Sequence, residues 1–102
     1  MTYQLVLQFK GSSLGDYDSM VSLEDDLIEA LTGTAEVDGH DVGSGETNIF
    51  IITPAPLPTF ERAKAVLERS GLLGAVSAAY RPLSGHTFTV LWPHHQKKFS
   101  VA

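Results

Sequence analysis

The chain has 102 residues, of which 43% are hydrophobic and 19% charged, a composition typical of one folded domain. A net charge of −5 with seven dispersed Lys and Arg residues argues against nucleic acid and anionic membranes as partners, because both bind clustered positive charge. The lack of cysteine excludes disulfides and thiolate chemistry. The chain also lacks a basic, apolar leader and an apolar run of the roughly 20 residues that cross a bilayer, so we expect an acidic cytoplasmic protein of bacterial type.

The N-terminal part of the chain predicts a strand followed by a helix. Apolar and polar residues alternate from 3 to 9, as in a half-buried strand. A helix follows, capped by Asp18 or Ser19, with apolar residues at helical spacing up to Leu31. Gly33 is the expected stop of this helix.

The remainder of the chain predicts a second helix and four more strands. Pro58 or Thr59 begins the helix and Gly71 ends it. The first two of these strands form a hairpin around Gly43-Ser44-Gly45, and the last two are joined across Ser84-Gly85. The four strands are predicted at residues 34–42, 47–53, 75–80 and 87–92.

The resulting order, β-α-β-β-α-β-β, predicts an α+β fold of the ferredoxin-like split βαβ type. Right-handed crossovers place the first and third strands at the centre of an antiparallel sheet. The fifth strand then lies beside the fourth, which gives the spatial order second, third, first, fourth, fifth. Both helices are expected on one face of the sheet, in a single domain from 1 to 93 with a C-terminal tail at 94–102.

The face of the sheet opposite the helices is expected to be partly apolar. Val6, Phe50 and Ile52 are the side chains predicted there. An apolar patch of this kind usually binds another protein or a second copy of the chain. The alternative is that the tail covers this face, with Trp92 or Phe99 folding back over it.

A polar segment between 38 and 46 is the candidate for ligand or metal binding. Asp38, His40, Asp41 and Glu46 combine an imidazole with carboxylates, a set that binds divalent metals or forms an oriented base. A bulge at Gly39 would turn Asp41 outward and let three or four of these side chains converge. The alternative is a polar edge strand whose charges and bulge prevent edge-to-edge pairing.

Two segments, Leu23 to Leu31 and Val37 to Ile51, resemble small uncharacterised bacterial proteins that consist of one ferredoxin-like domain. The resemblance covers most of the chain. It implies the fold and a bacterial cytoplasm, and it assigns no activity and no functional residue. The order of elements also resembles that of regulatory ACT-type domains, which bind small molecules at subunit interfaces, although their glycine-containing signature after the first strand is missing.

The leading functional expectation is a non-enzymatic interaction or regulatory domain, without a cofactor, that acts through the open sheet face as a homodimer or with a partner protein. The first alternative is a domain, or a small enzyme, that binds a small ligand or a divalent metal through the segment from Asp38 to Glu46. An acidic protein that neutralises a basic partner is the second, and it follows from size and charge alone.

Overall fold

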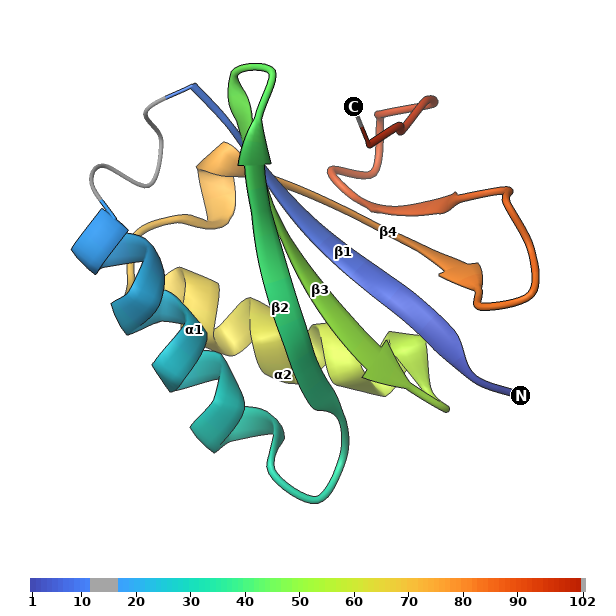
Figure 1. The fold of residues 1–102 in the computed structure, drawn as a ribbon, viewed down its shortest axis with the longest axis horizontal. Coiled ribbons are helices and arrows are strands. Elements are labelled where there is room, and N and C mark those ends of the chain that lie inside the picture. The colour runs from blue at the N-terminus through green and yellow to red at the C-terminus, as the bar shows by residue number, and fades with distance from the viewer. Residues whose placement is uncertain (12–16, 102) are drawn as a thin grey trace.

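The computed structural model describes residues 1–11 and 17–101 (Figure 1). The sheet has the order β2-β3-β1-β4-β5, and every neighbouring pair is antiparallel. The predicted α+β plait and its strand order are therefore confirmed, with β5 added to the four strands of the ferredoxin-like plan. The elements are β1 (Tyr3–Lys10), α1 (Tyr17–Leu31), β2 (Glu36–Gly43), β3 (Glu46–Thr53), α2 (Pro56–Arg69), the short helix η1 (Leu73–Ala75), β4 (Val76–Pro82) and β5 (Thr89–Trp92).

The hydrophobic core lies between the sheet and the two helices, which Figure 1 shows on the same side of the sheet. Alternate residues of each central strand point into it, because successive side chains of a strand point to opposite faces. The helices contribute residues three and four positions apart. The core comprises Leu5, Leu7, Phe9, Leu23, Leu27, Leu31, Ile49, Ile51, Phe60, Ala63, Val66, Leu67, Val76 and Ala78.

Helix α1 begins one residue before the predicted cap. Because Tyr17 is already helical, Asp18 and Ser19 lie in the first turn and neither is the capping residue. The carboxylate of Asp18 is still favourably placed there, close to the positive end of the helix dipole. The predicted loop from Lys10 to Asp16 falls largely outside the described residues.

Helix α2 starts at Pro56, two residues earlier than the first predicted position. Proline is accepted there because the first amides of a helix have no partner within it. The helix ends as predicted near Gly71, whose φ of 70° leaves the right-handed region. The Leu72 amide then donates to the Leu67 carbonyl at 2.8 Å, which closes the last turn.

The edge strand β2 carries the predicted bulge. Its register against β3 shifts between Val37 and Gly39, and Gly39 has a φ of 128°, which a residue with a Cβ rarely adopts. The strand starts at Glu36 rather than at 34, because the amides of Thr34 and Ala35 both donate to Leu31 and complete the end of α1. The bulge changes which residues of β2 face the helices.

Strand β5 is shorter than predicted, and Trp92 at its end faces the helices. The indole Nε1 donates to the Leu73 carbonyl at 3.1 Å, and the Lys64 ammonium lies 4.6 Å from the ring centroid. Trp92 also packs against the core. The expectation that Trp92 folds over the open face is therefore wrong, since this side chain closes the opposite side of the sheet.

The segment after β5 folds back onto the open face of the sheet. Ser77 on β4 donates to the Gln96 Oε1 atom at 2.9 Å, and the rings of Phe88 and Phe99 pack at a tilt of 58°, with centroids 5.0 Å apart. Figure 1 shows this segment in red, on the side of the sheet away from the helices. Among the described residues, no helix is both long and apolar enough to cross a membrane.

Candidate functional site

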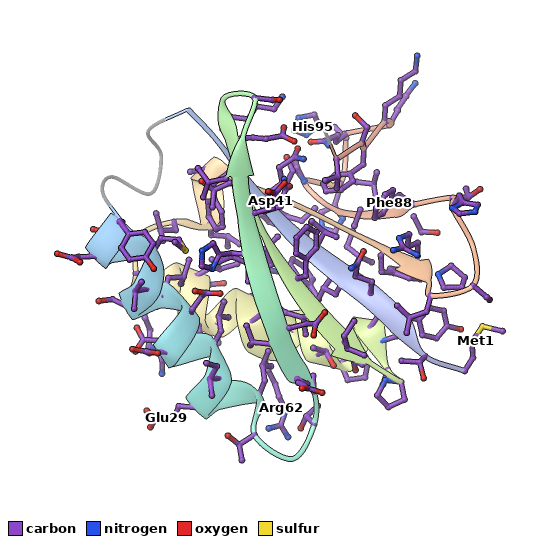
Figure 2. The ribbon with its side chains drawn as sticks, in the orientation of Figure 1. Met1, Glu29, Asp41, Arg62, Phe88 and His95 are labelled. Carbon is purple, nitrogen blue, oxygen red and sulfur yellow. The ribbon has the colours of Figure 1, made fainter. Side chains whose placement is uncertain are left out.

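The bulge in β2 separates two of the residues predicted to share a site. Beyond it, His40 pairs with Ile49 of β3, and Asp41 pairs with Asn48. Ile49 belongs to the core under the helices, and its neighbour Asn48 points to the other face. His40 therefore lies on the helix side and Asp41 on the open side, where Figure 2 shows Asp41 on the same side of the sheet as Phe88 and His95.

Among the described residues, Asp38 and Glu46 complete no set of three metal-ligating groups with either of these two side chains. Asp38 is exposed beside the bulge, and Glu46 begins β3, where its Oε1 atom accepts a hydrogen bond from Asn48 Nδ2 at 3.4 Å. Within residues 1–11 and 17–101, no three His, Asp or Glu side chains are placed so that they could hold a metal ion. The structure thus does not show the convergence on which the metal-site hypothesis depended.

His40 instead contacts a carboxylate of helix α1. Its Nδ1 atom lies 3.0 Å from the Glu24 Oε1 atom, with 30% of the histidine side chain and 13% of the glutamate side chain exposed. The ring of Tyr17 lies edge-on, 6.3 Å away. This arrangement ties the edge strand to the helix that covers it, and a partly exposed pair contributes up to about 1 kcal/mol to stability.

The predicted apolar patch is present on β3, on the face that the helices leave open. Phe50 and Ile52 alternate with the core residues Ile49 and Ile51, and each of the two is partly exposed. Val6 pairs with Phe50 across the sheet but has no exposed surface. Val6 thus lies beside the patch without contributing to its surface, which Phe50 and Ile52 form.

A buried pair of amide side chains lies next to this patch. Gln8 Nε2 donates to Asn48 Oδ1 at 3.0 Å and to the Ser100 carbonyl at 2.8 Å. Gln8 is 5% exposed and Asn48 is 1% exposed. Buried polar groups need such partners, because an unsatisfied one costs about 1–3 kcal/mol. The pair therefore attaches the C-terminal segment to the centre of the sheet.

The C-terminal segment and the sheet enclose a shallow cleft of about 520 Å³. Its walls combine amide, ammonium and aromatic groups, and the Gln8 side chain forms part of its floor. The residues that line it are Gln8, Lys10, Glu46, Thr87, Phe88, Gln96, Lys97, Lys98, Phe99 and Ser100.

Arg81 organises the loop on the β4 side of the same face. It pairs with Gln4 of β1 and so points away from the helices. Its Nη1 atom donates to the carbonyls of Pro82, Leu83 and Gly85, at 3.1, 3.2 and 3.0 Å. Carbonyl oxygens do not neutralise a guanidinium, so the positive charge stays on this part of the surface.

Sequence reasoning placed polar residues on this face but missed that Gln8 and Asn48 form a buried pair. The available signal was the presence of an amide in the middle of each of the two most apolar strands. The hydrogen bond to Ser100 could not be inferred, because it joins residues 92 positions apart through a segment without regular structure.

No family model, no curated protein and no solved structure matches the chain.

Proposed function

We propose that this chain is a non-enzymatic interaction or regulatory domain that binds another protein, or a second copy of itself, through the sheet face opposite the helices. The observation that carries the proposal is the partial exposure of Phe50 and Ile52 on the strand β3, which lies inside the sheet rather than at its edge. Large apolar side chains grouped on such a surface are typical of protein contacts. A bacterial cytoplasmic setting belongs to the same proposal, supported by the absence of cysteine.

The arrangement of the polar residues supports this choice over a ligand or metal site on β2. His40 is engaged by Glu24 on the helix side, while Asp41 is exposed on the open side. A shared site needs its groups on one side of the sheet. A protein partner can instead use exposed carboxylates at the rim of an apolar patch, where they favour correct orientation.

A photo-crosslinking residue placed at Ile52 tests the proposal. The purified protein and the soluble extract of its native host are illuminated, and adducts are identified by mass spectrometry. The matched control carries the same residue at Leu57, which is 57% exposed on helix α2. We expect a discrete adduct at Ile52 only. No adduct at Ile52, or equal adducts at both positions, would contradict the proposal.

A further inference from the structure

The open face of the sheet has two halves at different heights. On the half formed by β1 and β4, Val6 and Ala79 have no exposed surface although no helix covers them. The C-terminal segment lies over this half, attached through Gln8 and Ser77. On the half formed by β2 and β3, Phe50 and Ile52 remain partly accessible. We call the half formed by β1 and β4, which the C-terminal segment covers, the raised half, and the half formed by β2 and β3 the low half.

The two halves also carry opposite charge. Strand β2 contains three carboxylates, Glu36, Asp38 and Asp41, and no Lys or Arg. Glu36 and Asp41 are exposed members of this group, and they pair with the open-face residues Ile52 and Asn48. Residues 76–101, which form β4, β5 and the C-terminal segment, contain three Lys and Arg and no Asp or Glu. The low half is therefore acidic, and the raised half is basic through Arg81, Lys97 and Lys98.

A surface with these properties is complementary to itself. Two copies can meet through their open faces about a two-fold axis that runs parallel to the strands, between β3 and β1. In this arrangement β2 of one copy lies against β4 of the other, and β3 of one copy lies against β1 of the other. The raised half of one copy then lies against the low half of the other, in both directions at once. Such a self-complementary patch is the requirement for a closed symmetric dimer.

We propose that the partner of the open face is a second copy of this chain, bound about this axis. The contact rests on the proposed function, since it uses the same face. Phe50 and Ile52 lie at its centre, and the C-terminal segment of each copy fills the low half of the other. Asp41 of one copy lies near the ammonium groups of Lys97 and Lys98 of the other, and Glu36 lies level with Arg81, which sets the orientation.

Charge reversal on either half should weaken the dimer, and mixing the two variants should restore it. The low-half variant is D41K, and the raised-half variant is K97E/K98E. Each change acts twice in a symmetric dimer, so we expect the association constant to fall about tenfold or more. In the mixed hetero-dimer, the reversed low half of one variant meets the reversed raised half of the other, and the two unchanged halves meet each other. Both contacts again join opposite charges, so the hetero-dimer forms with near wild-type affinity. The control E61K makes the same charge change as D41K, on helix α2, and should leave association unchanged.

Sedimentation equilibrium over a concentration series provides the measurement. A wild-type protein that stays monomeric throughout overturns the inference. So does a mixture that associates no better than the separate variants. A wild type that dimerises, loses its dimer in I52E but is unaffected by both charge reversals keeps the face and rejects this orientation. If the wild type is monomeric while the crosslinker at Ile52 captures a different protein, the proposed function survives and self-association does not.

Discussion

Replacing Gln8 with leucine is expected to lower the free energy of unfolding by about 2 kcal/mol. The leucine removes both Nε2 hydrogens, which serve Asn48 Oδ1 at 3.0 Å and the Ser100 carbonyl at 2.8 Å. The carbonyl of Ser100 belongs to an exposed residue and can turn to water. The amide oxygen of Asn48 cannot, because that residue is 1% exposed. The cost is therefore dominated by one buried acceptor without a donor.

The two single variants and the double variant Q8L/N48L form a thermodynamic cycle. Removing both amides eliminates the orphaned acceptor, so the double variant should be more stable than the sum of the single effects predicts. Urea unfolding followed by Trp92 fluorescence gives the free energies. For a domain of this size, a loss of about 2 kcal/mol corresponds to a fall in Tm of about 8–16 °C.

The same substitution should release the C-terminal segment, because Ser100 loses its donor on the sheet. Trypsin cleavage after Lys97 or Lys98 then becomes faster in Q8L under native conditions than in the wild type. A loss below about 0.5 kcal/mol, the usual range for surface changes, would refute the reasoning. Strict additivity in the cycle would refute it as well, since it would show that Gln8 and Asn48 are not coupled.

Three further substitutions test other parts of the structure, each by urea unfolding followed by far-UV circular dichroism, which does not depend on Trp92. Gly39→Ala should cost about 1–3 kcal/mol, because its φ of 128° is unfavourable with a Cβ although the space is open; Gly43→Ala, without a positive φ, is the control and should be near neutral. Leu27→Ala, in the core, should cost about 2–5 kcal/mol, whereas Ile28→Ala, 51% exposed on the same helix, should cost less than about 0.5 kcal/mol. Trp92→Phe should cost about 1 kcal/mol or more through loss of the bond to Leu73; no measurable loss would mean that the indole does not close the helix side.

The order and pairing of the strands could be predicted because they follow from local patterns and general rules. Alternation in β1, a turn between β2 and β3 and right-handed crossovers leave few topologies. Element ends were less predictable, because they depend on hydrogen bonds beyond the periodic residues. The amide of Ala35, for example, completes the end of α1 and so delays β2. Helix α2 likewise starts earlier than predicted, at Pro56, because the first turn of a helix accepts proline.

The candidate site was harder to predict, because one inserted residue changes the side of the sheet to which the following side chains of a strand point. The bulge at Gly39 was foreseen, and it does turn Asp41 to the open side. It also leaves His40 facing helix α1, where Glu24 happens to lie within reach. That contact depends on the packing of a helix against an edge strand, which no pattern in the sequence specifies. The side of the sheet on which Trp92 lies was equally hard to predict, because it depends on the register of the four-residue strand β5.

The attachment of the C-terminal segment has a practical consequence for handling the protein. The last described contact with the sheet is at Ser100, whose carbonyl accepts a hydrogen bond from Gln8. A fluorescent protein, affinity tag or immobilised linker joined after residue 102 would begin within a few residues of this contact and apply load to it. Met1 is 84% exposed, and Figure 1 shows the N-terminus away from that segment. Fusions and surface coupling at the N-terminus should therefore preserve the native open face, whereas fusions at the C-terminus should alter it.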